Sequence, residues 1–117
     1  MKQENIKFKA KRLDGKGWAI GDLLHSYENG AIIIPIEVGG AFSVDSDTVC
    51  QFTGLKDKNG TPIYEGDIVI YKDNNTERRG VIAWDSKAAA FCFGQGFLVH
   101  YPSENMVVIG NKFDKEK

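Results

Sequence analysis

The chain has 117 residues, of which 42% are hydrophobic and 26% are charged, and these proportions describe one globular domain rather than a disordered tail. Its formal net charge is -1, which argues against a protein whose main task is to coat nucleic acid, because phosphate binding needs clustered positive charge. Glycine is abundant, with 13 residues against 3 prolines, and this favours short strands joined by tight turns.

The first half of the sequence predicts a three-stranded antiparallel β-meander over about residues 1–50. Residues 6–13 alternate between apolar and basic side chains, which is the period of a half-buried strand. After a turn, residues 18–24 form a second strand, and an Asn-Gly turn at residues 28–30 precedes a third over residues 31–38. The third run is almost continuously apolar, so both of its faces are expected to be covered. The alternating side chains of the first strand are Ile6, Phe8 and Ala10 on one face and Lys7, Lys9 and Lys11 on the other.

The second half predicts a small SH3-like β-barrel over about residues 51–113, so we expect a mainly β fold with little helix, and residues 1–117 as a single domain. Two consecutive turns, Asp57–Gly60 and Tyr64–Asp67, lead into a strand at residues 68–71. A hairpin loop and further short strands follow at roughly ten-residue spacing, which is typical of such barrels. The loop is expected at residues 73–76 and the strands at residues 80–84, 89–93, 97–101 and 106–109.

Basic side chains gather at the start of the chain. Residues 1–16 carry six of them against two acids, whereas residues 17–70 carry two against eight. This asymmetry has two interpretations. It is either a basic patch that binds phosphate or some other polar partner, or a solvated strand face whose charge complements the acidic middle of the chain. Aromatic side chains near basic ones could take part in nucleic-acid binding. Alternatively, they pack in a core or an interface. The residues that could bind nucleic acid are Lys7, Lys9, Lys11, Arg78, Arg79 and Trp84.

The sequence carries no pattern for catalysis or for metal binding. Its two histidines and two cysteines are scattered singly, and no CxxC, HxH, HExxH or GxSxG motif occurs. Asp57 and Asp67 are expected to accept backbone N–H groups in the two turns, which is a simpler role than acid and base catalysis. A small hydrolase that uses Asp57, Glu65, Asp67 or His100 is the third and least favoured hypothesis. We therefore predict no enzymatic activity, no metal and no cofactor.

The cysteines and the N-terminus bear on the cellular compartment. Cys50 and Cys92 stand among apolar residues, so two buried, reduced thiols are predicted, with a single disulfide as the alternative. The first residues lack the apolar core of a signal peptide, and no apolar run approaches the length that crosses a membrane. We therefore expect an intracellular, reducing compartment and no membrane partner.

Several short motifs, in order over almost the whole chain, resemble the YopX family of phage and prophage proteins. The most specific strings are QFTGLKDKNG and IYEGDIV, with IKFKA before them and VIGN after them. Two features depart from the family pattern: Cys50 stands where a small residue is frequent, and the tail after Asn111 is shorter and more charged. The motif positions are Gln51, Thr53, Gly54, Leu55, Asp57, Gly60, Tyr64, Glu65, Gly66, Asp67, Gly110 and Asn111.

The resemblance implies an intracellular, phage-encoded, mainly β protein of unassigned biochemical activity, and it supplies no catalytic or ligand-binding residue. The motif residues are expected to set the two turns and the first barrel strand. The expected function is a non-enzymatic interaction or assembly module in the cytoplasm of a bacterial host, with an unknown protein partner or with a second copy of the chain. The alternative is a nucleic-acid-binding accessory module that uses the basic strand and the barrel. No small-molecule substrate is evident.

Overall fold

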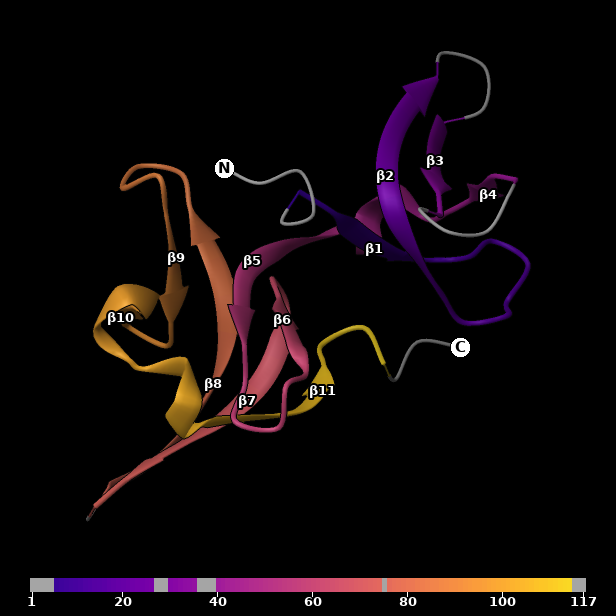
Figure 1. The fold of residues 1–117 in the computed structure, drawn as a ribbon. Helices are drawn as coiled ribbons and strands as arrows, with labels where there is room; N and C mark the ends of the chain where they lie inside the picture. The colour runs from indigo at the N-terminus through magenta and orange to yellow at the C-terminus, as the bar shows by residue number, and fades with distance from the viewer. Residues whose placement is uncertain (1–5, 27–29, 36–39, 75, 115–117) are drawn as a thin grey trace. The chain divides into compact units, whose positions relative to one another are not determined.

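The computed structural model describes residues 6–26, 30–35, 40–74 and 76–114 (Figure 1). The chain divides into two compact units, and the division falls between Phe52 of unit 1 and Thr53 of unit 2. All regular elements in the described residues are β-strands or 3₁₀ helices of three residues, so the predicted mainly β fold is confirmed. No helix in these ranges has the length and apolar character needed to cross a membrane.

Unit 1 is a sheet built from β1 (Phe8–Lys11), β2 (Trp18–Ser26), β3 (Gly30–Ile34), β4 (Phe42–Ser43) and the first residues of β5 (Cys50–Lys56). β1, β2 and β3 pair in sequence order and antiparallel, which confirms the predicted meander. β4 adds to β3, and the start of β5 pairs with the free edge of β1. A 3₁₀ helix at Ser46–Thr48 precedes β5.

The core of unit 1 lies on one face of this sheet, where Ala10, Ala19 and Ala31 pack with Ile33 and Val44. The prediction that both faces of β3 are covered is wrong. Ala31 and Ile33 are buried, but their neighbour Ile34 is 39% exposed, because an antiparallel sheet needs only one packed face. β3 ends directly before a proline, which cannot donate to the ladder. The predicted strand end at residues 36–38 and most of the turn at residues 28–30 lie outside the described residues.

Unit 2 contains an open five-stranded antiparallel sheet. Its strands are β7 (Asp67–Asp73), β8 (Thr76–Asp85), β9 (Ala90–Phe93), β10 (Gly96–Phe97) and β11 (Met106–Asn111). They lie in the order β10-β9-β8-β7-β11, and the edge strands do not pair with each other in the described residues. No closed barrel is therefore found, and the SH3-like barrel stays a prediction. β6 (Pro62–Tyr64) lies beside β5, and the pairing of Asp73 with Thr76 confirms the predicted hairpin loop.

Two segments of unit 2 differ from the predicted strands. The strand predicted at residues 97–101 is wrong beyond Phe97, because a 3₁₀ helix at Leu98–His100 turns the chain. The N–H of Tyr101 donates to Leu98 O at 3.0 Å and closes that turn. Conversely, β5 is a strand that the sequence analysis does not predict. Gly54 interrupts the alternation of side chains there and takes a φ of +89°, which favours glycine.

The core of unit 2 lies on one face of the five-stranded sheet. Ile82 of β8 and Phe93 of β9 are opposite each other and buried. Trp84 and Phe91 form the next pair on that face, since side chains of a strand repeat with a period of two. Their rings meet edge to face with centroids 5.0 Å apart. The buried cluster is completed by Ile63, Val69, Tyr71, Leu98 and Met106.

Both cysteines are free thiols, and they belong to different units. Cys50, in β5, is buried, as predicted. Cys92, in β9, is only half-buried, because it projects from the sheet face opposite to the Phe91 and Phe93 side chains. The prediction of two buried thiols is therefore correct for Cys50 and wrong for Cys92.

In unit 1, β2 and β3 approach each other closely at Gly21. A Cβ atom at this position would lie 2.1 Å from the main-chain oxygen of Ile34 and 2.8 Å from Cα of Pro35. Cβ atoms in proteins essentially never lie within 3.0 Å of a non-bonded heavy atom. A side chain at residue 21 would therefore push the two strands apart.

We expect Gly21→Ala to lower the free energy of unfolding by about 1–3 kcal/mol, which is the usual cost of overpacking. Urea unfolding at neutral pH measures the change. Gly110→Ala is the control, since a Cβ there would meet Asp114 Oδ2 at 3.4 Å, an ordinary contact, and should change the free energy by less than about 0.5 kcal/mol. Equal effects of the two substitutions would contradict the close approach of β2 and β3.

Candidate interaction site

Asp57 is a buried carboxylate that ties the first motif turn to the last strand. Its Oδ1 accepts from the N–H groups of Asn59 and Thr61, each at 2.9 Å, and its Oδ2 accepts from the N–H of Val108, at 2.9 Å. Burial alone would raise the pKa of Asp57, but these three hydrogen bonds outweigh it and hold the pKa below its ordinary value. The carboxylate thus caps the turn, as predicted, and also reaches a strand 51 residues away in the sequence.

Asp67 makes a second connection, from the other motif turn to the end of β11. Its Oδ2 accepts from the N–H of Tyr64 at 2.8 Å, and its Oδ1 accepts from the side-chain amide of Asn111 at 2.9 Å. In the same turn, Gly66 O accepts from the N–H of Lys112 at 2.9 Å. Burial, together with the negative charge of Asp67, raises the pKa of Tyr64 to about 12, so its phenol is neutral at physiological pH.

The side chains considered for a hydrolase therefore lie in different surroundings. Asp57 and Asp67 serve as acceptors inside the two turns, and Glu65 is half-buried beside the second turn. His100 is exposed on its 3₁₀ helix, with its ring centroid 6.4 Å from that of Phe97. In the part of the chain that the structure describes, no group of three or more His, Cys, Asp and Glu side chains could hold a metal ion.

The remaining motif residues shape β5, both turns and the end of β11. Thr53 Oγ1 donates to Ile63 O at 2.8 Å and accepts from the N–H of Leu55 at 3.1 Å, so it fixes β5 against β6 on both sides of Gly54. The N–H of Gly60 donates to Asp57 O at 3.0 Å and closes the first turn. Two further motif positions have other places: Gln51 is exposed on β5, and Gly110 follows an irregularity in the β7–β11 ladder.

An apolar groove in unit 2 lies where the cover over the core face of the sheet is incomplete. Its volume is about 560 Å³, and none of the side chains that line it is charged. Phe91 of β9 lies in it, Leu55 of β5 contributes from one segment, and the 3₁₀ helix with its flanks contributes from another. Val99, on that helix, is 83% exposed. The lining residues are Thr53, Leu55, Ala88, Ala90, Phe91, Phe97, Leu98, Val99, Tyr101, Pro102 and Ser103.

A smaller hollow, which we call the arginine hollow, lies beside this groove. Its volume is about 250 Å³, and it is lined by Arg78 and Arg79 of β8, by Phe93, Gly94 and Gln95, and by Tyr101. Both arginines are exposed, and in the described residues neither forms an ion pair. Tyr101 also lines the groove, so the two hollows adjoin.

The basic first strand is in unit 1 and is not a freely solvated face. Lys7 Nζ lies 4.6 Å from the ring centroid of Phe52, and Lys9 Nζ lies 4.6 Å from that of Trp18. Lys11 Nζ lies 5.9 Å from the Trp18 ring, and all three lysines are half-buried. These cation–π contacts place the lysines among apolar and aromatic side chains. The lysines and the arginines belong to different units.

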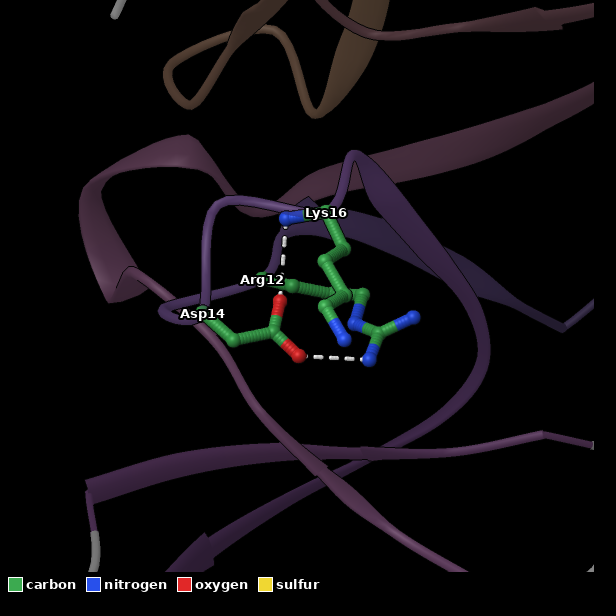
Figure 2. A network of polar contacts seen from close by, with 3 residues as sticks. All are labelled: Arg12, Asp14 and Lys16. Carbon is green, nitrogen blue, oxygen red and sulfur yellow. Dashed lines mark hydrogen bonds and ion pairs between the residues drawn. The ribbon is translucent and has the colours of Figure 1, made fainter.

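The turn after β1 engages the next basic residue, Arg12 (Figure 2). Its Nη2 forms an ion pair with Asp14 Oδ2 at 2.5 Å, and its guanidinium lies 4.1 Å from the ring centroid of Phe42. Asp14 Oδ1 accepts from the N–H of Lys16 at 3.0 Å. Desolvation alone would raise the pKa of Asp14, but the hydrogen bonds from Lys16 and Arg12 outweigh it and lower that pKa. The Arg12 guanidinium therefore has its contacts, with Asp14 and Phe42, within unit 1.

Sequence reasoning finds part of this surface. Arg78, Arg79 and Leu55 are named from their motifs or charges, and Trp84, 45% exposed, packs against Phe91 next to the groove. The contributions of Phe91, Phe97, Val99 and Tyr101 are missed. Phe97 and Val99 do have a sequence signal, the apolar run Phe97–Val99 that follows a glycine, but that run is typical of a strand as well.

Comparison with known proteins identifies a family for this chain. A family model described as YopX protein matches residues 7–116, which is nearly the whole chain. No curated protein and no solved structure matches the chain significantly. The matched range contains both motif turns, β11 and all residues that line the groove and the arginine hollow.

We expect Asp57→Asn to lower the free energy of unfolding by about 2 kcal/mol at neutral pH, because an amide cannot accept all three N–H groups. The folded-state pKa lies below the ordinary value of 3.8, so the stabilisation is fully present above that value. It is lost as the pH falls through the lower pKa of the folded state. Urea unfolding at a series of pH values should show wild type and variant converging in strong acid.

The control for this experiment is Glu65→Gln, which removes an acid from the neighbouring turn. Because the Glu65 carboxylate makes no hydrogen bond to another described residue, its loss should change the free energy by less than about 0.5 kcal/mol. A difference between wild type and Asp57→Asn that stays constant down to strong acid would contradict the role assigned to the Asp57 charge.

Proposed function

Starting from the YopX family, to which the chain belongs, we propose that this protein is a non-enzymatic interaction module that binds an apolar segment of a partner protein. The observation that supports the proposal is the apolar groove of unit 2. A groove without a charged lining residue favours an occupant whose side chains are apolar at that point. The groove lies in the range of volumes that ligand sites have, roughly 300–1,000 Å³.

The groove suits a short extended segment with one or two anchoring side chains. Burial of one large apolar side chain contributes about 1.5–3 kcal/mol. Two such anchors, less the cost of ordering the segment, correspond to weak, reversible binding with a Kd of about a millimolar. Val99 and Phe97 are exposed, and their side chains supply part of that apolar area.

The same proposal covers the setting of the protein and its chemistry. We propose that it acts in the cytoplasm of a bacterial host, encoded by a phage or a prophage, as the family resemblance implies. The absence of enzymatic activity is part of this proposal, and it is supported by Asp57 and Asp67, whose carboxylate oxygens accept hydrogen bonds within the motif turns. An SH3-like barrel in the second half is not required for it.

Val99→Asp tests the groove, because this exposed substitution should leave the fold intact and place a charge where an apolar segment would bind. With the protein as bait in lysates of infected or lysogenic bacteria, we expect a nuclease-resistant partner with wild type and at least tenfold less with the variant. Ile109→Asp, a matched change on β11 outside the groove, should retain the partner. Capture that Val99→Asp leaves unchanged would contradict the proposal.

Nucleic-acid binding is the second candidate. The exposed Arg78 and Arg79, which form no ion pair with another described residue, favour it. It predicts binding to an oligonucleotide that weakens steeply with salt, and Arg78→Glu should reduce the slope of log K against log salt by about 1. Lys7→Glu and Lys9→Glu should weaken binding as well if the basic strand takes part. Fluorescence anisotropy measures these constants, and no binding at low salt would remove this candidate.

A further inference from the structure

The groove and the arginine hollow adjoin along β9. Phe91 lines the groove and Phe93 lines the arginine hollow, and both project from the same face of this strand. Residues two apart on an extended chain lie about 6.6 Å apart. The two hollows are therefore separated by about the distance between side chains i and i+2 of an extended peptide.

Tyr101 forms a firmly held boundary between the two hollows. Its ring meets Phe93 and Tyr71 edge to face, with centroids 5.1 and 5.2 Å away. It also lies against the backbone of β10, since a Cβ at Gly96 would be 2.9 Å from the Tyr101 ring. These three contacts fix the Tyr101 ring. The distance between the two hollows is therefore set by the packing of the fold and does not depend on a ligand.

The arginine hollow has the chemistry of a site for one anionic group. Arg78 projects from the same face of β8 as Ile82, because side chains alternate along a strand, and its guanidinium can donate hydrogen bonds in a fork that matches a carboxylate. The Gln95 amide adds a polar group. Neither acid at the tip of the same hairpin forms an ion pair with Arg78 in the described residues. Asp73 Oδ2 accepts from Tyr71 Oη at 3.3 Å, and Glu77 pairs with Lys72 at 3.6 Å.

We infer that unit 2 binds an extended segment of a partner protein that carries a large apolar side chain and, two residues away, an aspartate or glutamate. The apolar side chain enters the groove and the carboxylate enters the arginine hollow, with Tyr101 between them. Charge complementarity selects the acid, and the uncharged groove selects its apolar neighbour. This inference rests on the proposed protein-interaction function and adds the chemistry of the partner.

A protein segment fits this pair of hollows better than a nucleic-acid strand. A strand that placed one phosphate against Arg78 would carry its next phosphate past the uncharged groove, where no described lining side chain neutralises it. A peptide can alternate acidic and apolar side chains at the spacing that β9 sets. One short peptide can therefore place an apolar side chain in the groove and an acidic side chain in the arginine hollow.

Selection from a library of random peptides displayed on yeast tests the inference. With wild-type protein, we expect enriched sequences to contain a large apolar residue two positions from Asp or Glu. Anisotropy with an enriched peptide should then show about tenfold weaker binding to Arg78→Glu/Arg79→Glu, and a similar loss when the acid of the peptide is replaced by its amide. Lys58→Glu, which replaces a positive by a negative charge in the same unit outside both hollows, should bind within about twofold of wild type.

The outcomes separate the inference from the function on which it rests. Enriched peptides that are apolar, show no preference for an acid and bind the double variant normally would overturn the inference and leave the groove as a protein-binding site. No enrichment by wild-type protein would overturn both. An oligonucleotide that binds wild type but not the double variant, with no acidic peptide enriched, would assign the arginine hollow to phosphate. A concentration-dependent mass that the double variant loses would assign the arginine hollow to a second copy of the chain.

Discussion

Two buried carboxylates hold unit 2 together, and the rest of that unit depends on them. Asp57 bonds the first turn to Val108, and Asp67 bonds the second turn to Asn111. A buried charge costs several kcal/mol unless its oxygens are hydrogen-bonded, so these aspartates stabilise one arrangement of the turns against β11. Because β11 pairs with β7 at the edge of the sheet, the same bonds fix where the segment from β5 to β6 lies over the core. The motif residues thus position other residues of unit 2.

The surface that remains uncovered follows from this arrangement. β6 and the 3₁₀ helix supply Ile63 and Leu98 to the core, but neither buries the Phe91 end of the sheet face completely. The groove that results is apolar because it is the edge of the core, and the arginine hollow is charged because it lies where β8 leaves the core towards its exposed hairpin tip. The edge of the core and the base of the hairpin meet at Tyr101. An apolar groove and a charged hollow therefore lie side by side.

Much of the fold follows from short-range patterns. Side-chain alternation in residues 6–13 and the turn residues that follow it predict the meander of unit 1, and Asp73 to Thr76 predict the hairpin of unit 2. The errors have physical causes. A continuous apolar run in β3 shows only that both faces of the strand could be buried. Whether each face is buried depends on the segments that pack against it. Phe97–Val99 has the composition of a strand, but a tight backbone turn after Leu98 lets that side chain enter the core.

The sequence by itself determined the class of fold, the two turns and the family, because each depends on residues close together in the chain or on a specific string of them. It also named the arginines, because charge is visible without structure. Only the tertiary structure decided which residues share a site. Leu55, Phe91 and Tyr101 come from three segments, and they meet because Asp57 and Asp67 bond turns to a strand far along the chain. No local pattern encodes such a meeting, since it depends on packing and on pairing between distant strands.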